Sequence, residues 1–555
     1  MHITNLKKVA AALTVAALTL TGCGSASVKP IPADQIPAGD IAETPRDQIK
    51  DGGTLTTAIT EISEQENAFN ADGTAYTTTI CSWYNPSLTL FSTDGKFKPN
   101  PDYLTDVKEE AKSGQTVVTY TLRDEATFND GTPIDWKAFE TTWLINNGES
   151  EDYQPSSTDG YDQIKSVTPG KNAKQAVVTF QGTYPWWQGL FGNIAHPALK
   201  QKENYDDYLN KLHPEWGAGP YTVDSADFNS GVVTFKPNPK WWGLKPKLDK
   251  RVFRQMESDA ALNAFRNGEI DVVGANTRDN YATVMNLPKV DVRIGHAPHL
   301  SLLTLNSDAP VLKDKQVREA IVRGIDRDLL GKIWFKGLPY QETPPGSFLL
   351  QTFQDHYEDN FGKVAKFDAE RSKQLLDQAG WKLPEGKEIR EKDGQPLKVR
   401  YVITGTDALG KATSAATQKM MRNIGVDMDV ETHPSSDFSR IADNHDFDLF
   451  PMGFSRGDPY GVAYTAQTYN SDSQLNRSGT GTPELDAKIK ELAHIPSREG
   501  QLKRANELEP ELLGTYGIVP LYNGASIVAV KRGLVNVGAP GFGQMQIEDI
   551  GWKKE

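Results

Sequence analysis

The sequence predicts an α/β protein in which short strands alternate with helices. Segments dense in β-branched residues, typical of strands, occur at residues 116–122, 175–180, 231–235 and 398–403. Segments with apolar residues at helical spacing occur at 135–144, 259–265, 314–325 and 412–424. This alternation favours an α/β architecture, and the length of 555 residues predicts two to four domains.

Residues 1–22 are expected to be a signal peptide. Lys7 and Lys8 precede an apolar run, Val9 to Leu20, which is too short to cross a bilayer as a helix. The sequence Leu20-Thr-Gly-Cys23 then resembles a bacterial lipobox, in which a small residue precedes the cysteine at the cleavage point. The resemblance implies lipidation of the Cys23 thiol. An ordinary secretory signal with an incidental cysteine is the alternative.

Residues 23–48 are expected to form the lipidated end and a flexible tether, because prolines recur there without an apolar period. If Cys23 is lipidated, the only other cysteine, Cys81, has no disulfide partner. We therefore expect Cys81 to be a small buried side chain.

Elements of the folded part follow in order. Gly52 and Gly53 precede a first strand, and the turn Asp130-Gly131 follows the strand at 116–122. Asp135 is placed to cap a helix at its N-terminus. The helices at 259–265 and 412–424 are each followed by a glycine, the usual C-terminal stop.

The composition excludes several function classes. A formal net charge of -13 argues against nucleic-acid binding and against adsorption to anionic lipid, so membrane contact should be through the lipid alone. No nucleophile, base and orienting group converge in sequence, so we expect no enzyme. The segment 405–412 nearly matches a phosphate-binding loop, but Ala412 replaces the hydroxyl residue that binds magnesium. We expect no cofactor and no metal, and a monomer.

An ordered set of motifs resembles solute-binding proteins of the peptide/nickel ABC-transporter family. The motifs lie at residues 120–123, 128–133, 219–221, 238–243, 265–271, 305–306, 314–327, 375–381 and 520–522. Phe128 stands where the family usually has Trp. The set runs from about residue 50 to the C-terminus. With Gly457-Asp458-Pro459, the pattern is most similar to oligopeptide-binding lipoproteins of mycobacteria and corynebacteria.

The resemblance implies a two-lobed, periplasmic-binding-protein-like fold (type II, cluster C), with an additional domain inserted in the first lobe. The expected boundaries are 49–76, 184–300 and 521–555 for lobe I, 77–183 for the inserted domain II, and 301–520 for lobe II. It also implies that an oligopeptide is captured between the lobes and delivered to ABC permease subunits in the membrane.

Asp458 is the candidate for the partner of the peptide ammonium group. A strand is expected at 447–450, followed by a loop that includes Gly453 and ends at Pro459. In peptide-binding relatives the aspartate of this loop binds the α-amino group, and the residues before it pair with the peptide backbone. Carried over, Phe454 and Ser455 supply backbone contacts. A turn-forming aspartate before proline is the alternative for Asp458.

The opposite wall of the cleft is less defined by sequence. Glu61, Ile62 and Ser63 follow the first strand, where relatives place a ligand-contacting segment, and Trp83 and Tyr84 are candidates to line the cleft. For each, a structural role is the alternative. Arg456 is a candidate to neutralise a peptide carboxylate, and a solvated charge is its alternative.

Two other functions stay open at this point. One is a non-transport envelope protein of the same fold that binds a glycolipid or an assembly partner. The other is a nickel- or haem-binding relative. His296 and His299 are three residues apart, but Pro298 argues against a helical metal pair. A glycolipid partner needs no ammonium site, so Asp458 favours the peptide function.

Overall fold

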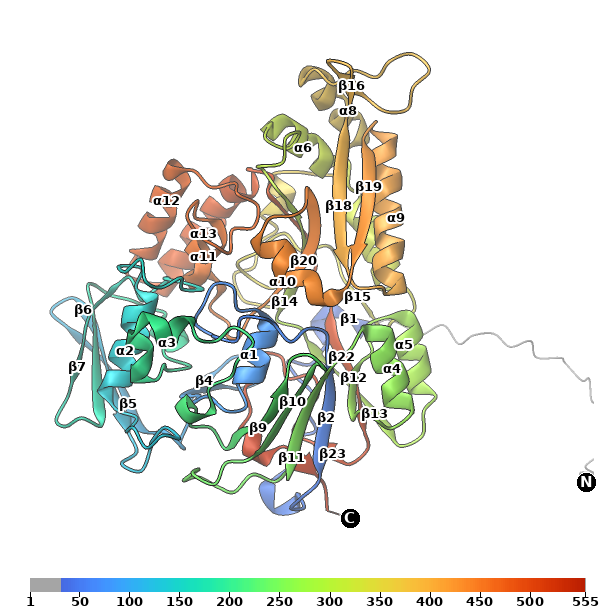
Figure 1. The fold of residues 1–555 in the computed structure, drawn as a ribbon. Helices are drawn as coiled ribbons and strands as arrows, with labels where there is room; N and C mark the ends of the chain where they lie inside the picture. The colour runs from blue at the N-terminus through green and yellow to red at the C-terminus, as the bar shows by residue number, and fades with distance from the viewer. Residues whose placement is uncertain (1–30, 555) are drawn as a thin grey trace, which may run out of the picture.

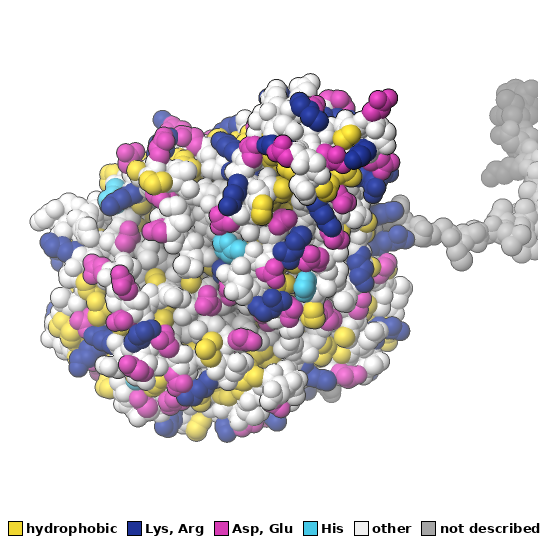
Figure 2. All heavy atoms as spheres, turned by 45° about the horizontal axis from the view of Figure 1, so that its top comes forward, with side chains coloured by type: hydrophobic (Ala, Val, Ile, Leu, Met, Phe, Trp, Pro, Cys, Tyr) yellow, Lys and Arg dark blue, Asp and Glu magenta, His cyan; other side chains and the backbone are white. Residues whose placement is uncertain are grey.

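The computed structural model describes residues 31–554 and shows three larger β-sheets with helices packed around them, together with four two-stranded sheets (Figure 1). The predicted signal peptide, Cys23 and residues 24–30 of the predicted tether lie outside the described residues. Among residues 31–554, no helix combines the length and the apolar character needed to cross a membrane. Figure 2 shows acidic and basic side chains interspersed over one face of the molecule.

The largest sheet has seven strands in the order β13-β22-β12-β2-β11-β10-β9. Strand β2 pairs parallel with β11 and β12, whereas the other pairs are antiparallel. The strands are β2 (Thr54–Ile59), β9 (Tyr221–Asp227), β10 (Val232–Pro237), β11 (Lys250–Gln255), β12 (Val272–Gly274), β13 (Val290–His296) and β22 (Ala525–Lys531). Helices α4 (Ser258–Arg266) and α5 (Arg278–Met285) follow β11 and β12, and α4 buries Ala261, Ala264 and Phe265 on one face.

A second sheet has five strands in the order β19-β18-β20-β14-β21. The strands are β14 (His299–Leu305), β18 (Lys398–Thr404), β19 (Asp427–His433), β20 (Leu449–Ser455) and β21 (Ile518–Tyr522). The helices of this part of the chain are α6 (Lys315–Arg323), α7 (Arg327–Trp334), α8 (Ala369–Gln378), α9 (Ala408–Asn423), α10 (Phe438–Asp443), α11 (Thr465–Tyr469), α12 (Pro483–Ala493) and α13 (Arg498–Leu513).

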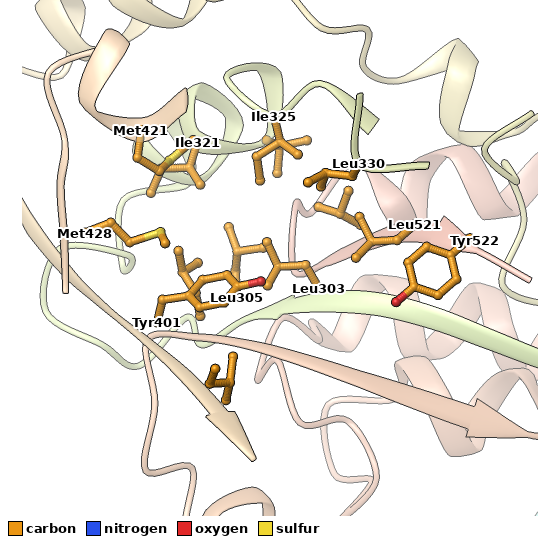
Figure 3. Close-up of a cluster of buried hydrophobic side chains, with 14 of the residues drawn as sticks. Leu303, Leu305, Ile321, Ile325, Leu330, Tyr401, Met421, Met428, Leu521 and Tyr522 are labelled. Carbon is orange, nitrogen blue, oxygen red and sulfur yellow. The ribbon is translucent and has the colours of Figure 1, made fainter. Parts of the chain in front are cut away.

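A continuous apolar core holds this second sheet against its helices (Figure 3). Leu303 and Leu305 of β14 face Ile321 of α6 and Leu330 of α7 across it. Because such burial stabilises by roughly 25 cal/mol per Å² of apolar surface, this core fixes the strands that lead to the cleft. The remaining labelled members are Ile325, Tyr401, Met421, Met428, Leu521 and Tyr522.

The third sheet has four strands, in the order β5-β6-β8-β7. These are β5 (Leu104–Lys112), β6 (Gln115–Leu122), β7 (Ile164–Pro169) and β8 (Gln175–Phe180), with helix α2 (Trp136–Asn146) beside them. The Asp135 carboxylate accepts a hydrogen bond from the Lys137 amide at 2.8 Å, so the predicted cap is confirmed. Short elements complete the fold: β1 (Ile31–Pro32), α1 (Ala75–Cys81), β3 (Thr89–Phe91), β4 (Phe97–Pro99), α3 (Lys202–Asp206), β15 (Tyr340–Gln341), β16 (Glu391–Lys392), β17 (Gln395–Pro396), β23 (Leu534–Val535) and β24 (Gly551–Trp552).

The strands of the seven-stranded sheet lie within 54–59, 221–296 and 525–531, those of the five-stranded sheet within 299–522, and those of the four-stranded sheet within 104–180, so β14 and β21 each cross a boundary expected from the sequence. The names lobe I, lobe II and domain II are used below for these three parts. Helix α9 begins earlier than expected, because the Asp407 carboxylate caps it through the Gly410 amide at 2.7 Å. A carboxylate therefore occupies the helix start where a phosphate-binding loop would hold an anion.

Residues 31–48 differ from the flexible tether expected for them. Strand β1 pairs with β15, and Arg46 forms an ion pair with Asp549. Ile36 and Ile41 are buried among other apolar side chains. The residues that make these contacts are not spaced with the period of a helix or a strand, so the sequence pattern did not predict the contacts. Cys81 is buried as expected, and burial raises the pKa of its thiol.

Candidate ligand-binding site

Two neighbouring cavities lie where the three domains meet. The first, here called the arginine cavity, has a volume of about 450 Å³ and is lined by Arg456 and Arg477 among others. The second, the carboxylate cavity, has a volume of about 480 Å³ and is lined by Asp102, Asp458 and Glu548 among others. Both are lined by Thr78, Ser156 and Gln467, so they are adjoining parts of one cleft. Their volumes suit a small ligand.

Strand β20 leads into this cleft with one edge unpaired. Its register with β14 pairs Phe454 with Leu300, and the Arg456 amide donates to the Pro298 carbonyl at 2.8 Å. In an antiparallel ladder alternate residues bond to the neighbour, so Phe454 and Arg456 use their backbone groups on β14. Gly453 and Ser455 therefore direct theirs to the opposite edge, where pairing with β18 involves only Leu449.

This geometry corrects one expectation. Phe454 was predicted to supply backbone contacts, but its backbone groups face β14, and its side chain instead lines the arginine cavity. The backbone groups of Gly453 and Ser455 face the other edge of β20, so a ligand contact at these two residues stays a prediction. A side chain at Gly453 is excluded because a Cβ there would lie 2.3 Å from the ring of His299.

Asp458 is a partly buried carboxylate that lines the carboxylate cavity. Its Oδ1 accepts from the Tyr460 amide at 2.7 Å, and its Oδ2 accepts from the Tyr464 hydroxyl at 2.6 Å. No Lys, Arg or His within residues 31–554 forms an ion pair with it. Burial raises the pKa of Asp458, while Tyr464, the Tyr460 amide and Arg456 oppose the shift. A carboxylate has room for further donors, so this group can accept a cation.

Arg456 is not the solvated charge that sequence favoured. Its Nη2 donates to the Phe348 carbonyl, and its guanidinium lies over the Phe348 ring, 5.1 Å from the centroid. Burial lowers its pKa, an effect that Asp458 opposes. The side chain lines the arginine cavity.

Glu61, Ile62 and Ser63 lie beside the cleft but line neither cavity. The Glu61 carboxylate accepts from the Ser439 hydroxyl at 2.8 Å and so joins lobe I to helix α10 of lobe II. Burial raises the pKa of Glu61 to about 7. Ile62 and Ser63 bond to Gln255 and Thr74, which makes their contacts internal to lobe I.

Trp83 and Tyr84 do not line the cleft as expected. Their side chains are 7% and 1% exposed and pack in the core of the seven-stranded sheet, which places them with lobe I although their sequence position was expected to belong to domain II. Trp83 meets Tyr221 with ring centroids 5.2 Å apart, and Tyr84 stacks on Phe235 at 6.2 Å. Other aromatic residues line the two cavities: Phe69, Tyr76, Phe91, Tyr103, Tyr161, Trp241, Phe348, Phe438, Phe454 and Tyr464.

Several charged residues at the cleft had no sequence signal. Glu548 and Asp102 both bond to the amide of Gln546, at 3.1 and 2.8 Å. Burial and the neighbouring Asp102 raise the pKa of Glu548 to about 8. On the other side, Arg477 pairs with Asp443 at 2.5 Å. Gln546 and Asp102, and likewise Arg477 and Asp443, are far apart in the chain, so no local sequence pattern predicts that they meet.

The two histidines considered for a metal do not act together. His296 stacks on Phe353 with centroids 4.0 Å apart, whereas His299 lines the arginine cavity and bonds to Ser301 and Ser455. Burial lowers the pKa of His299 to about 4. No group of three or more His, Cys, Asp or Glu within the described range is arranged to hold a metal ion.

Comparisons with known proteins agree with this architecture. The family described as bacterial extracellular solute-binding proteins, family 5 Middle, matches residues 98–476. The oligopeptide-binding protein OppA of Mycobacterium tuberculosis is 30% identical over 97% of this chain and 93% of its own length. The periplasmic EDTA-binding protein EppA superposes with a TM-score of 0.79 at 26% identity, covering 93% of this chain and 98% of that one.

Similarity to a further solved structure supports the fold but nothing beyond it. The oligopeptide-binding protein AppA of Bacillus subtilis, in complex with a nonapeptide, superposes with a TM-score of 0.77 at 18% identity. The match covers 91% of this chain and all of that chain.

Proposed function

The chain belongs to the bacterial extracellular solute-binding proteins of family 5, and we propose that it binds oligopeptides in the cleft between its lobes. In this proposal Asp458 binds the peptide ammonium group. The free edge of β20 at Gly453 and Ser455 pairs with the peptide backbone like an added strand.

The strongest support for peptide binding is that the Asp458 carboxylate has no ion-pair partner in the described part of the chain. A partly buried carboxylate is stabilised by a cationic partner, because withdrawing an unpaired charge from water is costly. Asp458 has two hydrogen-bond donors but forms no ion pair with any Lys, Arg or His of residues 31–554, since Arg456 acts on its pKa only from a longer distance, and it lines a cavity. A ligand ammonium group supplies the missing charge.

The cleft also suits varied side chains. Polar side chains such as Asn85, Asn146 and Asn193 line the carboxylate cavity together with aromatic rings. Amide groups both donate and accept, and ordered water can complete their hydrogen bonds to different ligands. Backbone pairing then gives affinity that does not depend on ligand sequence.

Membrane attachment and delivery form the second part of the proposal. The lipobox-like sequence before Cys23 supports a lipid anchor at the outer face of the cytoplasmic membrane. An anchored receptor stays near its permease, which raises its effective concentration there without new contacts. Cys23→Ala should release the protein from the membrane while leaving peptide affinity in solution unchanged.

Native mass spectrometry of the purified protein tests the ligand class. Co-purified peptides, released by denaturation and absent from an Asp458→Asn preparation, are the expected result. A bound glycolipid, nickel chelate or haem in place of peptides would contradict the proposal and favour the corresponding alternative.

A further inference from the structure

Besides Asp458, two further carboxylates line the carboxylate cavity, those of Asp102 and Glu548. The side-chain amide of Gln546 donates to Asp102 Oδ2 at 2.8 Å and to Glu548 Oε1 at 3.1 Å, and so holds the two acids side by side. Glu548 is only 3% exposed, and its Oε2 accepts no hydrogen bond from any other residue of 31–554. Because two adjacent carboxylates repel each other when both are charged, the pair lacks a cation.

The basic residues that contact Glu548 have other charge partners. The Arg46 guanidinium and the Lys247 amide both donate to the Glu548 backbone carbonyl, at 3.3 and 2.9 Å. The Arg46 side chain forms its ion pair with Asp549, and the Lys247 ammonium pairs with Asp51 at 2.8 Å. Within residues 31–554, neither acid of the pair has an ion-pair partner.

The carboxylate cavity as a whole is negatively charged. In the described part of the chain its lining contains three acids and no Lys, Arg or His. Tyr103, which follows Asp102 in the chain, and Trp241 add aromatic surface, with their ring centroids 5.6 Å apart. Aromatic rings attract cations. The cavity is thus complementary to a ligand segment with more than one positive charge.

The proposed course of the ligand assigns this cavity to its first residue. With its ammonium group at Asp458, the ligand backbone runs along Gly453 and Ser455, which line the arginine cavity. The side chain next to the ammonium group is then the part that enters the carboxylate cavity. The acid pair is near: Gln544 donates to the carbonyl just before Asp458 at 2.8 Å, and Glu548 is four residues further on, at most about 14 Å of extended chain.

We propose that Asp102 and Glu548 form a cation subsite, which binds the side-chain ammonium or guanidinium group of the first residue of the ligand. This inference rests on the proposed function and adds the preferred class of ligand, peptides that begin with lysine or arginine. Asp458 binds the α-amino group of the same residue. A neutral first side chain leaves the acid pair without its cation.

Isothermal titration with three tripeptides tests the subsite. The probes are Lys-Ala-Ala, its isomer Ala-Ala-Lys, and norleucine-Ala-Ala, which has a first side chain of similar length without the charge. The two isomers carry the same net charge, so general attraction to an acidic protein does not distinguish them. Lys-Ala-Ala should bind at least about tenfold more tightly than either of the other two.

Binding of Lys-Ala-Ala should also release a proton. Burial and the neighbouring Asp102 raise the pKa of Glu548 to about 8, so its carboxyl group is largely protonated at pH 7. A ligand cation beside it favours the ionised form and lowers that pKa. Titration at pH 7 in buffers of different ionisation enthalpy should show up to about one more proton released with Lys-Ala-Ala than with norleucine-Ala-Ala.

The double variant Asp102→Asn/Glu548→Gln should reduce the preference for Lys-Ala-Ala to less than about twofold and remove the additional proton release. Asp72→Asn is the matched control, because Asp72 is an acid that lines the arginine cavity instead, and it should leave both unchanged. Thermal unfolding of each variant checks that the fold is retained.

Equal affinities of the wild-type protein for the three probes, equal proton release, or an undiminished preference in the folded double variant would overturn the subsite and leave the peptide function intact. Failure of the wild-type protein to bind any of the three would count against the peptide function itself, and against the subsite with it.

Discussion

The two sides of the cleft differ in what they contribute. Lobe II presents a strand end with unpaired backbone groups, followed by a charged loop whose side chains line the cavities. On the lobe I side, Glu61 contacts lobe II, whereas Trp83 and Tyr84 are core residues. In the proposed function the ligand ammonium group is therefore recognised from lobe II, while these lobe I residues pack within lobe I or contact lobe II.

Among the changes that separate the two sides of the cleft, loss of the Asp458 charge should have the largest effect on peptide affinity. Asp458→Asn keeps the side-chain shape and an acceptor for Tyr464, but it leaves the ligand ammonium group without an anion. Breaking a buried ion pair costs about 3–5 kcal/mol, so peptide affinity should fall about a hundredfold or more. Isothermal titration of both proteins with the same peptide measures this loss of affinity. A change below tenfold would remove Asp458 from the binding role.

Truncation in the lobe I core should give the opposite pattern. Trp83→Ala removes a side chain packed among Tyr221, Phe235 and Phe253, and should cost about 3–5 kcal/mol of stability. Peptide affinity of the folded protein should change less than about threefold. Denaturant unfolding and titration together measure both quantities. A large loss of affinity with little loss of stability would place Trp83 in the cleft after all.

Sequence reasoning succeeded where the signal is local. Asp135 was identified as a cap because its contact is two residues away, whereas Asp458 was proposed because its loop resembles that of peptide-binding relatives, and it lines the carboxylate cavity. Trp83 and Tyr84 were misplaced because the burial of residues just after α1 depends on how that helix packs. Gln546 and Asp102 meet across 444 residues, a pairing that no local pattern encodes.

Weakening the support of Asp458 should have an intermediate effect. Tyr464→Phe removes the hydroxyl that donates to its Oδ2. A hydrogen bond to a charged group is worth about 1.5–3 kcal/mol, so affinity should fall roughly tenfold. Tyr401→Phe is a matched control, because Tyr401 is a buried tyrosine of the same lobe that lines neither cavity. Equal affinities for both variants would show that Tyr464 does not organise the site.

A second buried carboxyl on the lobe I side, Glu66, should make the stability of the fold depend on pH. Burial raises the pKa of Glu66 from 4.5 to about 8. A carboxyl with a raised pKa stabilises the fold below its unfolded value, and that contribution is lost as pH rises through the folded value. Wild-type stability should therefore fall by about 1 kcal/mol or more between pH 5 and pH 8.5.

Glu66→Gln should flatten this dependence, because the amide does not titrate. Thermal unfolding across the pH series measures the difference. A variant with the same pH profile as the wild type would show that Glu66 is not the group responsible.

The central claim is that lobe II binds a ligand ammonium group through Asp458. Titration of the wild-type protein with one peptide and its Nα-acetylated form tests it without altering the protein. Acetylation removes the positive charge and should weaken binding about a hundredfold or more. Equal affinity for the two forms would contradict the account.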